Sequence, residues 1–199
     1  MRGLLVDFGG VLTSNVFASF ARFCEAEGLD TDHVKQLFRS DERARELLVR
    51  LETGELAEPE FERAFGERLG LPPQDLIARL FGGIEPDAAM IGAVRSARAQ
   101  GIVTGLLSNS WGMATDYASL GDDLFDAQVI SAREGMRKPD PRIYPLAAER
   151  MGLPPEEIVF VDDLGFNLKP AKALGMATVL HEDAATTIPQ LRQLLGVAL

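Results

Sequence analysis

The stretch that decides the fold of this chain is Leu4-Leu5-Val6-Asp7-Phe8-Gly9-Gly10. Three aliphatic residues, a carboxylate and two glycines are typical of a buried strand that ends in a turn. The glycines leave the backbone free to approach a ligand closely. Asp7 is therefore a candidate ligand or catalytic residue, although capping of a following helix would also explain an aspartate at this position.

Similar short apolar runs recur along the chain, and most are separated by helical patterns. The runs are residues 102–107, 127–130, 158–161 and 177–180, and the clearest helical patterns are residues 87–99, 141–151 and 168–174. Buried strands that alternate with amphipathic helices predict an α/β fold, a Rossmann-like, doubly wound parallel sheet with helices on both faces. Residues 15–84 differ, because they are rich in helical patterns and contain no convincing strand.

Polar residues stand at the ends of three of these runs. Asp7 ends the first, Ser108 and Asn109 follow the second, and Asp162-Asp163 follows Ile158-Val159-Phe160-Val161. In an open parallel sheet, ligands bind at the carboxyl ends of the strands, so these side chains should meet at one edge. Ser-Asn is also ordinary turn chemistry, and the aspartate pair could be a solvated turn. Two adjacent carboxylates repel one another, however, so a cation would favour this arrangement.

Two further polar residues have positions that suggest a role. Lys138 precedes Pro139, which favours an extended loop and lets the lysine point at an anion as a single charge. An exposed surface lysine is the alternative, and its neighbour Arg137 is expected at the surface or facing residues 15–84. Asn167 follows Asp163 by four residues, where it could orient a neighbouring side chain or simply serve the first turn of a helix.

Taken together and in this order, the four segments 6–13, 107–110, 137–140 and 160–167 resemble the motifs of the haloacid dehalogenase superfamily, most of whose members are phosphatases. The resemblance covers essentially the whole chain. It implies a core formed by residues 1–14 and 85–199, and a small all-helical cap, of subfamily I, formed by residues 15–84 directly after the first strand.

The resemblance also implies a role for each motif residue. Asp7 would be the nucleophile that forms an aspartyl-phosphate, and Lys138 would bind and neutralise the phosphate. Ser108 and Asn109 would hold a phosphoryl oxygen, and Asn167 would orient the lysine or the second aspartate. Mg²⁺ would be bound by Asp7, the backbone carbonyl of Gly9 and Asp163, with Asp162 beside them.

One expected part is missing. Phosphatases of this superfamily usually carry Asp-x-Asp in the first motif, and the second aspartate acts as general acid and base; here Gly9 stands in its place. The first reading is a phosphatase of a small phosphomonoester, such as a sugar phosphate, whose acid comes from water or from the cap, where Glu46, Glu52 and Glu55 are candidates. The second is a phosphate- or metabolite-binding protein that has lost turnover. The third is a 2-haloacid dehalogenase, which the paired aspartates disfavour because dehalogenases need no Mg²⁺.

Composition limits the remaining possibilities. The chain has 199 residues, a formal net charge of −10 and one cysteine, Cys24. The charge argues against nucleic acid or an anionic membrane surface as partner, and no segment reaches the roughly 18 apolar residues of a membrane span. A single cysteine fits a reducing compartment, so we expect a cytoplasmic protein acting on a small phosphorylated metabolite. The sequence does not give the oligomeric state, nor does it decide whether Trp111 lines a pocket or packs under the cap.

Overall fold

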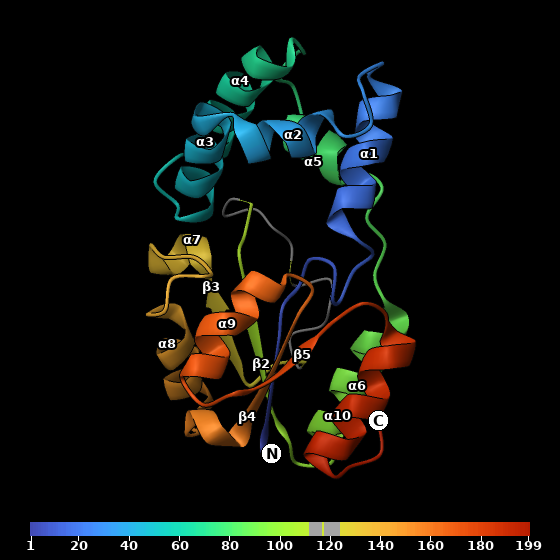
Figure 1. The fold of residues 1–199 in the computed structure, drawn as a ribbon, viewed down its shortest axis with the longest axis vertical. Helices are drawn as coiled ribbons and strands as arrows, with labels where there is room; N and C mark the ends of the chain where they lie inside the picture. Colours follow the sequence, from blue (N-terminus) through green and yellow to red (C-terminus); the bar gives the residue numbers. More distant parts are fainter. Residues whose placement is uncertain (112–116, 118–123) are drawn as a thin grey trace.

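The computed structural model describes residues 1–111, 117 and 124–199, and its centre is a parallel sheet of five strands (Figure 1). The strand order is β3-β2-β1-β4-β5. The bounds are Gly3–Val6 for β1, Val103–Ser108 for β2, Ala127–Ile130 for β3, Ile158–Asp162 for β4 and Ala177–Leu180 for β5. All five strands coincide with the predicted apolar runs to within one residue, and β1 ends one residue before Asp7. The predicted α/β class is confirmed.

Alternating side chains of the strands bury both faces of the sheet. On one face, Leu4 and Val6 of β1 pack with residues of α6 (Ala88–Ala99) and α10 (Ala184–Leu195). On the other face, Leu5 packs with residues of α8 (Ile143–Met151) and α9 (Gly165–Ala173). Because both faces are covered, the strands carry continuous apolar runs, which explains why they were visible in the sequence. The helix α9 begins three residues earlier than predicted and so includes Asn167 in its first turn.

Five helices form the cap, which lies over the edge of the sheet where the strands end (Figure 1). They are α1 (Val16–Ala26), α2 (His33–Ser40), α3 (Glu42–Glu52), α4 (Glu58–Leu69) and α5 (Leu76–Phe81). The cap has an apolar core of its own, in which Leu47, Phe61 and Phe65 are buried. The short helices α7 (Ser131–Glu134) and η2 (Pro155–Glu157) complete the described elements, and α7 lies below the end of α3.

Two antiparallel chain segments connect the cap to the core. Thr13 pairs with Pro86 in an isolated bridge, and Ser14 N donates to the Glu85 carbonyl at 2.7 Å. The side chains of Asn15 and Asp87 then cap the helices that follow, α1 and α6. The chain therefore leaves and re-enters the core at one place, close to Asp7. Among the described residues, no helix has the length and apolar character required to cross a membrane.

Candidate active site

The topology brings the predicted motif residues to one edge of the sheet. The strand β1 lies between β2 and β4, so Asp7 is flanked by Ser108 at the end of β2 and by Asp162 at the end of β4. Asp163 follows directly in the loop to α9. All four side chains thus lie beneath the cap, at the carboxyl ends of the strands, where open α/β sheets bind their ligands.

Lys138 connects two of the aspartates. Its Nζ lies 2.8 Å from Oδ1 of Asp7 and 2.7 Å from Oδ2 of Asp162, and its side chain is fully buried. Burial opposes the charge of the ammonium group, but the carboxylates of Asp162 and Asp7 outweigh it and raise the pKa of Lys138 above its ordinary value. The lysine is therefore a fixed positive charge beside Asp7.

Both carboxylate oxygens of Asp162 already have donors from the chain. Oδ1 accepts from Leu164 N at 2.8 Å and from Asn167 Nδ2 at 3.0 Å, and Oδ2 accepts from Asn167 Nδ2 at 3.1 Å and from Lys138 Nζ. Asp162 is thus suited to holding the lysine in place. Asn167, which we expected to orient the lysine or the second aspartate, contacts Asp162 directly.

Three carboxylates crowd around this single lysine. One carboxylate oxygen from each of Asp7, Asp162 and Asp163 lies within 4.8 Å of the other two. Burial, helped by the other two carboxylates and opposed by Lys138, raises the pKa of Asp7 to about 8. Burial and Asp162 likewise raise the pKa of Asp163 to about 6. A divalent cation would remove this repulsion, and carboxylate oxygens are the ligands that Mg²⁺ prefers, so the residues fit a magnesium site.

Gly10 keeps this cluster compact. Its φ is +77°, and a Cβ there would lie 2.5 Å from Oδ2 of Asp163. No side chain fits between the first motif and Asp163, which gives the second glycine of the sequence motif a physical reason. Gly9 has no positive φ, so its backbone does not require a glycine. A Cβ at Gly9 would meet only Cγ2 of Val16, at 3.1 Å.

The Asn109 side chain is bonded to the loop that carries Lys138. Its Oδ1 accepts from the backbone N of Lys138 at 2.8 Å, and its Nδ2 donates to the Lys138 carbonyl at 3.0 Å. The amide side chain therefore fixes the lysine loop, and its role toward a phosphoryl oxygen stays a prediction. Ser108 accepts a hydrogen bond from the Tyr117 hydroxyl at 3.0 Å, a partner that the sequence did not indicate.

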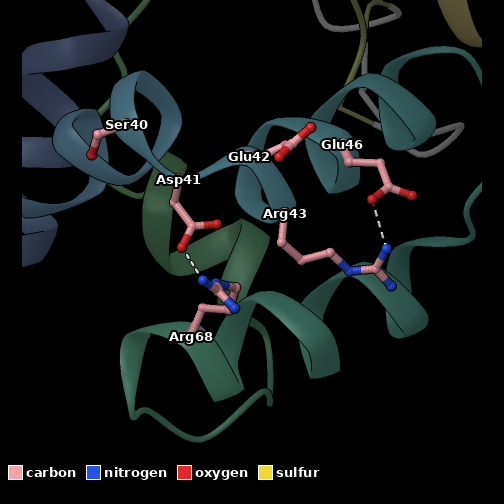
Figure 2. Close-up of a pocket in the computed structure, with 6 residues that line it drawn as sticks. All are labelled: Ser40, Asp41, Glu42, Arg43, Glu46 and Arg68. Carbon is pink, nitrogen blue, oxygen red and sulfur yellow. Dashed lines mark hydrogen bonds and ion pairs between the residues drawn. The ribbon is translucent and has the colours of Figure 1, made fainter.

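The three candidate glutamates of the cap have very different surroundings. Glu46 is exposed, and its carboxylate lies 2.7 Å from the Arg43 guanidinium. Figure 2 shows this pair, on α3 of the cap. Glu55 is also exposed. Glu52 is 5% exposed and lies 2.7 Å from Nε of Arg137, in the core loop next to Lys138. Burial raises the pKa of Glu52 to about 7, against the opposing charges of Arg137 and Lys138.

A cavity of about 920 Å³ separates the core site from the cap. Asp7, Lys138 and Asp163 line it from the core, and Glu52 lines it from the cap. Among the described residues, two buried side-chain oxygens lack a hydrogen bond, Oε2 of Glu52 and Oδ1 of Asn167. Both residues line this cavity; the Asn167 oxygen leaves an acceptor available to a ligand or to water, whereas the Glu52 oxygen lies in the ion pair with Arg137.

Aromatic side chains form much of the remaining wall of the cavity, and no sequence motif pointed to them. Trp111 both lines the cavity and contacts the cap, since its ring lies 4.9 Å from that of Phe81 and 5.5 Å from that of Phe20, measured between centroids. The two alternatives left open for Trp111 are therefore both correct. One signal was present in the sequence: seven of the eleven phenylalanines fall within residues 15–84.

Comparisons with known proteins agree on one family. The family model for haloacid dehalogenase-like hydrolases matches residues 1–175. The chain is 33% identical over 153 residues to the sesquiterpene phosphatase astK of Aspergillus oryzae, covering 73% of this chain and 77% of that protein. It is 26% identical over 215 residues to the D-ribitol-5-phosphate phosphatase of Bacteroides thetaiotaomicron, covering 98% and 99%. It is 39% identical over 112 residues to mouse acyl-CoA dehydrogenase family member 10, but spans only 10% of that protein's length and aligns over 55% of its own.

Solved structures share the fold. A predicted HAD-like family hydrolase from Porphyromonas gingivalis superimposes with a TM-score of 0.76 at 24% identity, covering 100% of this chain and 99% of that one. A HAD family enzyme from Bacteroides thetaiotaomicron, in complex with magnesium and inorganic phosphate, gives a TM-score of 0.67 at 23% identity, covering 92% and 94%. A dehalogenase gives a TM-score of 0.72 at 21% identity, covering 100% and 98%. These likenesses establish the architecture of the chain.

Proposed function

This chain belongs to the haloacid dehalogenase-like hydrolase family, and on that basis we propose that it is a Mg²⁺-dependent phosphatase of a small phosphomonoester. The observation that carries the proposal is the position of Lys138, whose Nζ bridges Asp7 and Asp162 while Asp163 stands beside them. A phosphoryl group facing Asp7 would meet a fixed positive charge and a cluster of carboxylates able to bind a cation. Two relatives named as phosphatases support the same chemistry.

Asp7 is the nucleophile in this proposal. Its carboxylate oxygen attacks phosphorus, the bond from phosphorus to the ester oxygen breaks, and an aspartyl-phosphate forms. Lys138 holds the Asp7 carboxylate in position and neutralises phosphate charge during transfer. Mg²⁺, held by Asp7, Asp163 and the carbonyl of Gly9, would reduce the repulsion between carboxylate and phosphate. Asp162 and Asn167 position the lysine rather than react.

Glu52 is the residue that we propose as general acid in place of the missing aspartate. It lines the cavity from the cap side, while Asp7 lines it from the core, and an in-line leaving group departs on the side away from the nucleophile. Its burial and its pKa of about 7 leave it partly protonated near neutral pH, as a general acid requires. The protonated carboxyl gives its proton to the departing alkoxide. It then takes a proton from the water that attacks the aspartyl-phosphate, which releases phosphate and restores Asp7.

A phosphate-release screen tests the proposal. Sugar, alkyl and aryl phosphates would be assayed with Mg²⁺ and with EDTA, beside an Asp7→Asn variant. We expect release that EDTA abolishes and that the variant lowers by at least about 10³-fold. Activity that survives EDTA would remove the metal from the mechanism.

Two other functions remain as outcomes of the same screen. Metal-independent halide release from 2-haloacids would indicate a dehalogenase. An absence of turnover, combined with a higher melting temperature in the presence of Mg²⁺ and beryllofluoride, would indicate a binding protein.

A further inference from the structure

The cavity beneath the cap has a polar floor and an apolar wall. The polar floor consists of the site described above, with Phe8 and Tyr117 beside it. The other aromatic side chains of the lining form the wall: Phe17, Phe20, Phe38, Phe81, Trp111 and Phe166. The rings of five of them, from Phe17 to Trp111, are linked by contacts, with Trp111 5.7 Å from Phe38 and Phe20 5.7 Å from Phe81 between centroids. The wall is thus a packed aromatic surface and not a set of isolated side chains.

Two of these rings are exposed although they are large and apolar. Phe166 is 50% exposed and Phe17 is 39% exposed, and they come from opposite parts of the molecule, α9 of the core and α1 of the cap. Exposed apolar side chains that gather at a cavity commonly mark a surface that an apolar ligand covers. Here the surface continues directly into the phosphate site.

Two of the neutral polar side chains that line the cavity, Asn109 and Thr13, already bond within the protein, whereas Oδ1 of Asn167 stays open to a hydroxyl donor. Both ends of the Asn109 amide bond to the Lys138 backbone. The Thr13 hydroxyl accepts from Gly10 N and donates to the Ser14 carbonyl. A sugar phosphate would bring several hydroxyl groups into this space, and each buried hydroxyl that lacks a partner lowers affinity.

The charged groups on the cap side are acidic. Glu62 and Asp75 line the cavity there, and Oε1 of Glu62 accepts from the backbone N of Ile77 at 3.0 Å. They would repel a second anionic group on the substrate. Of the two described cations that line the cavity, Arg137 already pairs with Glu52, so the position next to Lys138 is the one that favours a phosphate.

We propose that the preferred substrates are monophosphate esters of apolar alcohols, whose hydrocarbon part lies against the aromatic wall. This inference rests on the proposed phosphatase function and narrows it. In this inference an ester of an apolar alcohol takes the place of the sugar phosphate that the family resemblance suggested as an example substrate. The cavity volume of about 920 Å³ lies near the upper end of the ~300–1,000 Å³ typical of small-molecule sites.

A chain-length series measures this preference. The enzyme would be assayed with ethyl, butyl, hexyl and octyl phosphate below their micelle concentrations, and with glucose 6-phosphate. If each added methylene is buried against the wall, kcat/KM rises about three- to fourfold per methylene. Octyl phosphate should exceed glucose 6-phosphate by at least about 100-fold. A flat series, or a preference for glucose 6-phosphate, overturns the inference and leaves the phosphatase proposal intact.

Binding separates the two proposals if no ester is hydrolysed. Alkylphosphonates have no ester oxygen to release, and their dissociation constants for the wild-type protein with Mg²⁺ can be measured by calorimetry. A Kd that falls three- to fourfold per methylene supports the apolar site even when hydrolysis fails. A Kd that is independent of chain length refutes it.

A matched pair of variants locates the effect. Phe17→Ser removes an exposed ring from the wall, and Leu174→Ser removes an exposed apolar side chain that does not line the cavity. We expect Phe17→Ser to lower kcat/KM for octyl phosphate about tenfold and to leave ethyl phosphate unchanged. Leu174→Ser should change neither substrate. Equal losses for octyl and ethyl phosphate in Phe17→Ser would place the apolar contact elsewhere and overturn the assignment of the wall.

Discussion

Oε2 of Glu52 lies 2.7 Å from Nε of Arg137, so the end of a cap helix meets the core loop that carries the phosphate-binding lysine. The contact is an ion pair without hydrogen-bond alignment, because the Arg137 Nε–H is directed at the Lys138 carbonyl, 3.2 Å away. Beside it, Gly54 fits so closely over α7 that a Cβ would meet the Ala132 carbonyl oxygen. The cap therefore contacts the core directly at the position where Glu52 lines the cavity.

Glu52→Gln should separate substrates by their leaving groups. Loss of a general acid typically costs about 10²–10⁴-fold, so kcat/KM for an alkyl phosphate, which reports transfer to Asp7, should fall by at least about 100-fold. For p-nitrophenyl phosphate kcat/KM should change less than threefold, because its leaving group departs without protonation, while kcat falls for both esters because Glu52 also activates the attacking water. A purely structural role for Glu52 predicts equal losses of kcat/KM for both substrates, and steady-state kinetics with the two esters decides between them.

The same variant should alter the dependence of stability on pH. Burial raises the pKa of Glu52 from 4.5 to about 7, so the folded state binds its proton more tightly than the unfolded state. Ionised Glu52 therefore lowers the unfolding free energy as pH rises from about 4.5 to about 7, by an amount on the order of 3 kcal/mol. Glu52→Gln removes this loss, so its melting temperature should rise relative to wild type between pH 5 and 8. A constant difference between the two proteins across this range would contradict the raised pKa.

The selection of Glu52 shows what the sequence could and could not reveal. Buried parallel strands carry continuous apolar runs, so β1 and its neighbours were readable, and the motif residues followed from strand ends. The three cap glutamates could not be ranked, because the burial of Glu52 depends on the packing of α3 against α7, about 80 residues away in the sequence. Ser-Asn likewise gave no sign that the Asn109 side chain would bond to Lys138, 29 residues downstream.

Asn109→Ala should weaken the enzyme through the lysine loop. The variant loses both hydrogen bonds to the Lys138 backbone, and unpaired buried groups of this kind cost about 1–3 kcal/mol. We expect a lower melting temperature and a loss of at least about tenfold in kcat, since small displacements of a catalytic group are costly. Asn109→Asp is the comparison variant, because it retains the acceptor for Lys138 N, loses the donor and adds a negative charge facing the Lys138 carbonyl. It should lie between wild type and Asn109→Ala, and equal effects of the two variants would argue against this clamp.

Asp163→Asn should abolish stabilisation by Mg²⁺. The wild-type unfolding free energy should rise by about 2.7 kcal/mol at a Mg²⁺ concentration 100 times its Kd. The variant replaces the carboxylate that lies against Gly10 and points into the cluster, so its melting temperature should respond little to MgCl₂. Glu182→Gln, at an exposed acidic position away from the cavity, should respond as wild type does. If Asp163→Asn retained the full response, the metal site would have to be assigned to other residues.

Gly9→Asp should restore the acid that the first motif lacks. The backbone permits the change, because Gly9 does not adopt a positive φ, and the Cβ is close only to Cγ2 of Val16, at 3.1 Å. Combining it with Val16→Ala removes that contact. We expect turnover of an alkyl phosphate to rise more than that of p-nitrophenyl phosphate, because only the alkoxide needs a proton to depart.

The decisive measurement places Gly9→Asp, with Val16→Ala, in the Glu52→Gln background. If Glu52 is the acid that replaced the missing aspartate, the new carboxyl at position 9 should recover at least about tenfold of the activity on alkyl phosphates that Glu52→Gln lost. Gly10→Ala is the negative control, since its φ of +77° and the approach of Asp163 leave no space for a side chain, and it should lose activity on every ester. Melting temperatures and Mg²⁺ affinities must first show that the combined variant is folded and binds metal. If it is intact and alkyl phosphate turnover is not recovered, Glu52 and the absent aspartate do not share one role, and the proton must come from another source.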